Sequence, residues 1–171
     1  PVDMLSAGCW DGSKNVAVGC NAGSDWLIDP LGSDGFLSAD THNGHTQPNG
    51  LYHYHGEPRA LYDDNPGPEG SPVIGFAADG FPVYGPYFLD PNSGQVRKAV
   101  SGYTLREGSR PTGPGGTYDG FYNDDWNFTD SGDLDRCNGM TIDNQYGYFV
   151  TDTYPWMIKC FSGTPHFSFE K

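Results

Sequence analysis

Residues 73–88 have the sequence VIGFAADGFPVYGPYF, in which short apolar runs alternate with turn-forming residues. The runs 73–77 and 81–88 are rich in β-branched and aromatic residues, which are typical of strands. Asp79-Gly80 lies between them and favours a turn, because glycine adopts positive φ values at no steric cost. This stretch therefore predicts two short strands joined by a tight turn.

The same pattern recurs along the whole chain. Further predicted strands, each bounded by Gly, Pro, Asn or Asp, cover residues 16–18, 50–55, 99–105, 148–153 and 156–161. The 171 residues include 25 Gly and 14 Pro, a content that disfavours a helical bundle. We therefore expect a single all-β or mostly-β domain over residues 1–171, resembling a sandwich or barrel, with long Gly/Pro-rich surface loops such as 106–118.

The charge of the chain restricts its partners. The formal net charge is −13, and a field of that sign repels phosphate backbones and anionic lipid headgroups. No run of apolar residues approaches the 18 needed to span a bilayer. We expect neither a nucleic acid partner nor membrane insertion. A small molecule or a polysaccharide is compatible with this charge as a ligand. The sequence does not indicate the oligomeric state.

Four cysteines are spread widely, at positions 9, 20, 137 and 160, with no C-x-x-C pair. This spacing excludes zinc ribbons and thioredoxin-type motifs. Four cysteines allow three pairings, and the local one, Cys9 with Cys20 and Cys137 with Cys160, closes loops of modest length. Two such disulfides predict a secreted or periplasmic protein, and four reduced thiols in a cytosolic protein are the alternative.

An acidic segment offers one candidate metal site. Asp133 and Asp135 place carboxylates at alternate positions, a pattern that can bind calcium. The segment lacks the spacing of an EF-hand, and acidic loops are commonly solvated turns. Calcium at Asp133 and Asp135 is therefore one hypothesis, and a solvated turn is the other.

Histidines supply the stronger candidate, since four of the five fall within residues 42–55. In a strand, His53 and His55 project from one face and Tyr52 from the other. The turn signal at 48–50 can fold the chain back and bring His45 beside the pair. The cluster therefore predicts one transition-metal site formed by His45, His53 and His55. Asp40 or His42 is a candidate fourth ligand or hydrogen-bond acceptor for an imidazole.

The type of metal can be narrowed from the same residues. A blue-copper centre needs a free cysteine thiolate, which pairing of all four cysteines removes. We expect a mononuclear site with imidazole ligands that holds copper in preference to zinc, with iron behind both. Such a site would support redox or hydrolytic chemistry, in a metal-dependent oxidoreductase or hydrolase.

Two other functions use the same segment. A histidine base and a tyrosine acid, here His53 and Tyr52, can carry out β-elimination on a uronic-acid polymer without any metal. The negative charge of the chain disfavours such a polyanionic substrate. The other alternative is a non-catalytic module that binds metal or glycan at a cell surface, so the sequence leaves open whether the protein is an enzyme.

The segment 44–56, GHTQPNGLYHYHG, resembles the YHYH-domain family, which is named for its Tyr-His-Tyr-His tetrapeptide. Residues 74–87, 132–139, 148–152 and 154–155 are similar to further blocks of that family. The resemblance covers about residues 40–160 and implies an exported protein. It also implies a site that contains His45, His53, His55 and Asp79, with Tyr52 and Tyr54 in support.

Asp79 has two interpretations. Its position before Gly80 suits a residue that caps a turn. If its carboxylate points toward the histidines, it instead orients an imidazole or acts as a general base. We therefore count Asp79 with His53 and Tyr52 as a candidate catalytic residue.

Overall fold

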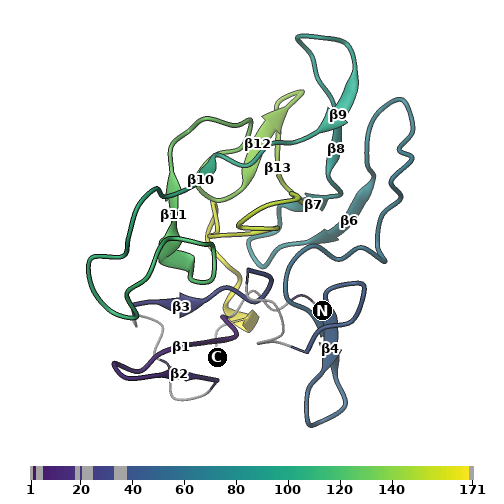
Figure 1. Ribbon diagram of the computed structural model, residues 1–171. Helices are drawn as coiled ribbons and strands as arrows, with labels where there is room; N and C mark the ends of the chain where they lie inside the picture. The colour runs from purple at the N-terminus through teal and green to yellow at the C-terminus, as the bar shows by residue number, and fades with distance from the viewer. Residues whose placement is uncertain (1, 3–5, 18–19, 21–24, 33–37, 170–171) are drawn as a thin grey trace. The chain divides into compact units, whose positions relative to one another are not determined.

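The computed structural model describes residues 2, 6–17, 20, 25–32 and 38–169. Over these residues the protein is almost entirely β, with short strands linked by long loops and only two single-turn 3-10 helices (Figure 1). The strands form five small sheets, none of which closes into a barrel. The all-β prediction is confirmed, and its barrel-like variant is not seen in the described part of the chain.

The chain divides into two compact units, of which the first contains residues 1–56 and 104–128. Its largest sheet has the order β2-β1-β3, and β4 and β5 form a separate hairpin. Its elements are β1 (Gly8–Trp10), β2 (Asn15–Val16), β3 (Leu27–Ile28), β4 (Gly44–Thr46), β5 (Tyr52–Tyr54), η1 (Asn123–Asp125) and β11 (Trp126–Phe128). Val18, in the predicted strand 16–18, lies outside the described residues.

The second unit contains residues 57–103 and 129–171. Its main sheet has the order β12-β13-β7-β6, and β8 and β9 form a hairpin. Its elements are β6 (Val73–Phe76), β7 (Pro82–Tyr84), β8 (Tyr87–Leu89), β9 (Val96–Lys98), β12 (Gly139–Ile142), β13 (Gln145–Phe149) and η2 (Phe167–Phe169). The strand β10 (Tyr103–Leu105), whose last two residues belong to the first unit, pairs with β11.

A buried ion pair orders the Gly/Pro-rich loop of the first unit. Arg110 donates to both carboxylate oxygens of Asp125, at 2.7 and 2.6 Å, and Asp125 is fully buried. The Arg110 guanidinium also lies over the ring of Tyr122, 4.9 Å from its centroid. Because burial of an unpaired charge is costly, this pair fixes the middle of loop 106–118 against the unit's interior.

The core of the second unit lies against its four-stranded sheet. Phe88, Ala99, Leu134 and Phe149 are buried together, and Tyr84 packs against them. The strand β13 pairs antiparallel with β12 but parallel with β7, which precedes it by about 60 residues in the chain. The core therefore depends on a pairing between segments far apart in sequence.

Several strand predictions are wrong in part or in full. The predicted strands 99–105 and 148–153 are strands only at 103–105 and 148–149. The predicted strand 81–88 is split into β7 and β8 at Gly85-Pro86, because Pro86 has no N–H to donate and Gly85 packs so closely on Ser71 that a Cβ atom would overlap it. Residues 156–161 are irregular, because Trp156 adopts a φ of 68° and its N–H donates to the carbonyl of Thr153, which closes a turn over residues 153–156.

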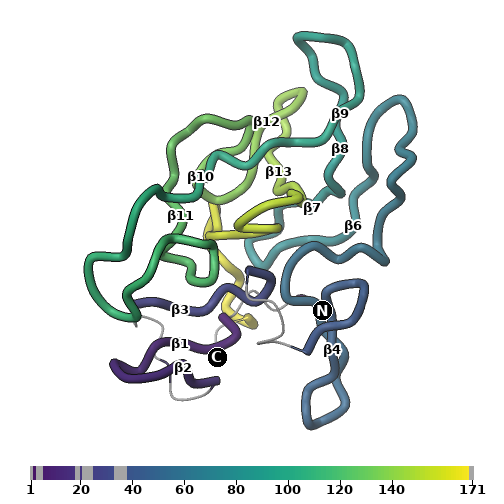
Figure 2. Tube along the Cα trace, viewed as in Figure 1, coloured from purple at the N-terminus to yellow at the C-terminus, as the bar shows by residue number. Residues whose placement is uncertain are grey.

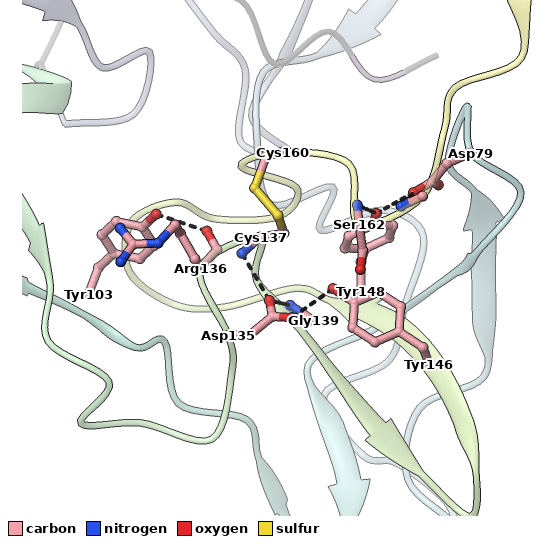
Figure 3. The surroundings of a disulfide bond; sticks show 11 residues. Asp79, Tyr103, Asp135, Arg136, Cys137, Gly139, Tyr146, Tyr148, Cys160 and Ser162 are labelled. Carbon is pink, nitrogen blue, oxygen red and sulfur yellow. Dashed lines mark hydrogen bonds between the residues drawn. A yellow bond between two sulfur atoms is a disulfide. The ribbon is translucent and has the colours of Figure 1, made fainter.

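Both predicted disulfides are present, Cys9–Cys20 in the first unit and Cys137–Cys160 in the second. Figure 3 shows the second disulfide and, beside it, the Asp135 carboxylate, which accepts the N–H groups of Cys137 and Gly139. Free thiols are therefore excluded for all four cysteines. None of the described helices is long and apolar enough to cross a membrane.

Candidate metal centre

The candidate centre is built on the hairpin of β4 and β5, where the chain turns back on itself (Figure 2). The turn is closed by the N–H of Gly50, which donates to the carbonyl of Gln47 at 2.8 Å. Gly50 has a φ of 84°, and the preceding Pro48 has the fixed φ that suits the first central position of a turn. The local sequence thus sets the length of the loop and, through it, the register of the two strands.

That register places three histidines on one face. His45 lies directly opposite His53 across the hairpin, and His55 follows two residues later on the same face. The Nε2 atom of His55 lies 2.9 Å from Nε2 of His45 and 2.8 Å from Nε2 of His53. His53 and His55 are buried and His45 is half-buried. The three ring nitrogens therefore converge on one point.

Backbone groups orient the His53 ring and fix the strand at His55. His53 Nδ1 lies 3.4 Å from the carbonyl oxygen of Leu51, which can only accept a hydrogen bond. A proton on Nδ1 leaves the lone pair of Nε2 directed at the other histidines, which is the tautomer that a metal ligand needs. The backbone N–H of His55 donates to the carbonyl of Asn43 at 3.0 Å and so fixes the end of the strand.

The opposite face of the hairpin carries tyrosines. The rings of Tyr52 and Tyr54 meet edge to face, with centroids 5.3 Å apart. Tyr52 donates its hydroxyl proton to Asp40 at 2.8 Å, and this hydrogen bond raises the pKa of Tyr52 to about 12. Gly44 lies under that hydroxyl, where a Cβ atom would overlap it. Tyr52 and Tyr54 thus point away from the triad.

Neither candidate for a fourth ligand belongs to the group of described residues that can hold a metal ion. Asp40 receives the Tyr52 hydroxyl and the backbone N–H groups of His42 and Gly44. The side chain of His42 is exposed in the turn that precedes β4. Asp40 therefore stabilises the hairpin through these hydrogen bonds. The group of residues that can hold a metal ion consists of His45, His53 and His55.

The arrangement of the triad suits a cation better than it suits hydrogen bonding. A ring nitrogen carries either one proton or one lone pair in the ring plane. His55 Nε2, which faces two other Nε2 atoms, can therefore make one good hydrogen bond with only one of them. A metal ion accepts all three lone pairs at once. With nitrogen ligands at 2.0–2.1 Å, a tetrahedral ion needs about 3.3 Å between donor atoms, which requires only a small opening of the rings.

Asp79 lies in the other unit, on the turn between β6 and β7. Its Oδ2 accepts the hydroxyl of Tyr148 at 2.5 Å and the N–H of Gly163 at 3.0 Å (Figure 3). The hydroxyl oxygen of Tyr148, a fully buried residue, in turn accepts the N–H of Ser162. Asp79 therefore joins the β6–β7 turn to the chain near the C-terminus, and its catalytic role stays a prediction.

The acidic segment uses its carboxylates for its own structure. Asp133 forms a two-point ion pair with Arg97, with both distances 2.7 Å, and also accepts the N–H of Val100. Asp135 accepts the N–H groups of Cys137 and Gly139 and the hydroxyl of Tyr146. These bonds occupy the oxygens that calcium would need, so we do not carry the calcium hypothesis forward.

Comparison with known proteins supports the resemblance found in the sequence. A family model described as YHYH protein matches residues 1–163 of the 171 residues. No curated protein and no solved structure shows a significant match to the chain.

Proposed function

The chain belongs to the YHYH family, and from that premise we propose that it is an exported protein that binds one transition-metal ion through His45, His53 and His55. The two disulfides fit an extracellular protein, because such bonds persist in oxidising compartments. The observation that carries the proposal is the convergence of three Nε2 atoms in a buried part of one hairpin.

The ligand set favours copper over zinc. Imidazole nitrogens suit copper, zinc, iron and nickel, whereas calcium and magnesium prefer oxygen ligands. For one set of nitrogen ligands, divalent copper binds more tightly than divalent zinc in the usual order of stabilities. The hairpin adds no thiolate, since all four cysteines are paired. We therefore propose copper as the preferred ion and zinc as the second.

Three imidazoles leave at least one coordination position for water or a substrate, as in catalytic zinc sites. Bound at this triad, the metal would supply either a nucleophilic hydroxide or a redox centre. The proposal therefore includes metal-dependent hydrolysis or oxidation, and the alternative is a surface module that binds the ion without turnover. Assays of the loaded protein against both reaction classes separate the two.

The metal-free elimination mechanism has less support. It requires a histidine base and a tyrosine acid on the same side of a substrate. His53 and Tyr52 are consecutive residues of a strand, so they point to opposite faces. The Tyr52 hydroxyl is also committed to Asp40. The hairpin geometry thus favours metal binding.

The test is metal analysis of protein purified without a histidine tag, with matched variants. We expect one copper or zinc ion per chain and, for copper, a paramagnetic resonance spectrum with nitrogen couplings. His53→Ala and His55→Ala should each lose the ion, whereas the control His42→Ala, which removes an exposed imidazole three residues from His45, should keep it. Metal-free wild-type protein that gains no metal from added copper or zinc would overturn the proposal.

A further inference from the structure

A second candidate binding site lies in the second unit, where a cavity of about 280 Å³ is lined by parts of β7, β8, β13 and the turn between β12 and β13. All of its lining residues belong to the second unit, so the cavity is complete without the histidine hairpin. Its volume lies near the lower limit of small-molecule cavities, which span roughly 300–1,000 Å³. The cavity therefore suits a small ligand.

Aromatic side chains form much of its lining. The rings of Tyr84 and Phe149 are stacked, with centroids 5.0 Å apart and planes 19° apart. Phe88 meets Phe149 edge to face at 6.3 Å, and both are buried in the core of the unit. Because Phe88 and Phe149 are buried, the half-buried Tyr84, held in place by its stack on Phe149, is the ring of this group that a ligand can contact without reordering the protein.

Two carboxylates accompany the rings. Glu69 and Asp143 line the cavity and are exposed to solvent. Among the described residues, neither side chain takes part in a salt bridge or a hydrogen bond. No lysine, arginine or histidine lines the cavity. Glu69 and Asp143 thus add negative charge to the lining without forming an ion pair with any described residue.

The basic residues of the neighbouring strand β9 lie over two rings of the cavity lining, with the Arg97 guanidinium 4.7 Å from the centroid of Phe88 and the Lys98 ammonium 5.4 Å from that of Tyr87, but their ion pairs are formed with other carboxylates. Arg97 is paired with Asp90 at 2.9 Å and with Asp133 at 2.7 Å. Lys98 is paired with Asp152 at 2.9 Å. These three carboxylates hold both cations, so β9 leaves Glu69 and Asp143 available to a cation from outside.

We propose that this cavity binds a small organic cation with a flat apolar body, of the arylalkylamine class. The body packs against Tyr84, and the ammonium group lies between the carboxylates of Glu69 and Asp143. Aromatic faces attract cations, and the formal charge of −13 raises the local concentration of such ligands. Carboxylates without a cation repel an anionic ligand and add little for a neutral one.

The first experiment compares ligands of one shape and different charge on the full-length protein. Phenethylamine, 2-phenylethanol and the neutral disaccharide cellobiose are titrated at low salt and followed by NMR shifts of the β12–β13 turn. We expect phenethylamine to bind about tenfold more tightly than 2-phenylethanol, and the difference to shrink at high salt. Equal affinity of the two, absence of amine binding, or tighter binding of cellobiose would each overturn the proposal.

The second experiment removes the charges without changing the fold. Asp143 has a φ of 50°, and asparagine tolerates this conformation, so Asp143→Asn keeps the turn. Combined with Glu69→Gln, it should weaken phenethylamine binding about tenfold and leave 2-phenylethanol binding unchanged. Glu107→Gln, an exposed carboxylate in the first unit, is the control for net charge. A loss of equal size in that control would overturn the proposal. Metal binding at the triad affects neither result.

Discussion

The histidine hairpin and the acidic segment 133–135 are both dense in metal-binding side chains, yet the structure uses them in opposite ways. In the hairpin, backbone groups and the Tyr52–Asp40 pair fix the strands, and the three Nε2 atoms face one another. In the acidic segment, the carboxylate oxygens themselves fix the chain. A ligand-rich sequence therefore forms a site only where other groups maintain the fold.

Electrostatics show the same contrast. The Arg97 guanidinium, through its hydrogen bonds, holds the pKa of the Asp133 carboxyl below its ordinary value, and burial only partly opposes this effect. The same Arg97 donates to Asp90. A cation at Asp133 would have to displace an arginine that is already bound at two points. At the triad, by contrast, His45, His53 and His55 direct their Nε2 atoms at one another.

The largest expected effect is the loss of metal-dependent stability when the triad is broken. An ion present at 100 times its dissociation constant stabilises the folded protein by about 2.7 kcal/mol. Removal of the ion by a chelator should lower the free energy of unfolding of the wild-type protein by about this amount. In His55→Ala the chelator should have no effect. Urea denaturation with and without chelator measures both values.

Asp133→Asn is the matched variant from the other region. It should show the same chelator-dependent change as the wild type, because Asp133 is not a ligand of the triad. A chelator effect that disappears in Asp133→Asn, or that persists in His55→Ala, would place the metal in the acidic segment and reverse the comparison.

Local sequence patterns were sufficient to predict the hairpin and the face on which its histidines lie. Pro48 and Gly50 indicate the turn, and the two-residue period of a strand places His53 and His55 on one face. Once the turn is fixed, the register that brings His45 opposite His53 follows. The pairing of the four cysteines was also predicted, because nearby cysteines close short loops.

Features that depend on distant parts of the chain were not predicted. The parallel pairing of β13 with β7 has no local signal, and neither does the stacking of Tyr84 on Phe149 that lines the cavity. The acidic segment was ambiguous for the same reason. Arg97 lies 36 residues before Asp133, and nothing in the spacing of the aspartates indicates that an arginine occupies them.

The next largest effect is expected for Asp133→Ala. The change removes two charged hydrogen bonds to Arg97 and one to the backbone of Val100. Because the Arg97 side chain is 38% exposed, solvent screens the pair, and we expect a loss of about 1.5 kcal/mol in the free energy of unfolding. Added calcium should not restore it. Recovery in millimolar calcium, or a wild-type protein stabilised by calcium, would contradict this interpretation.

A smaller effect is expected from acid. The N–H of Asn92 and then Arg97 lower the pKa of Asp90 to about 2, below its ordinary value of 3.8. The unfolded chain therefore binds more protons than the folded one, so stability rises with pH. The contribution is complete above about pH 4 and is lost as the pH falls toward 2. In metal-free protein, Asp90→Asn should reduce the slope of stability against pH in this range, and an unchanged slope would contradict the assignment.

The smallest effect is expected for Tyr52→Phe, which removes a single hydrogen bond between two solvent-exposed groups. That hydrogen bond is the main cause that lowers the pKa of Asp40, so the pKa of Asp40 should rise toward its ordinary value. An NMR titration of the Asp40 carboxyl carbon measures the change. Metal content should stay the same, because Tyr52 points away from the face that carries the triad. If Tyr52→Phe instead lost the metal, or abolished formation of an unsaturated sugar from a uronic-acid polymer, the two faces of the hairpin would act together. The elimination mechanism would then replace metal binding as the function of this segment.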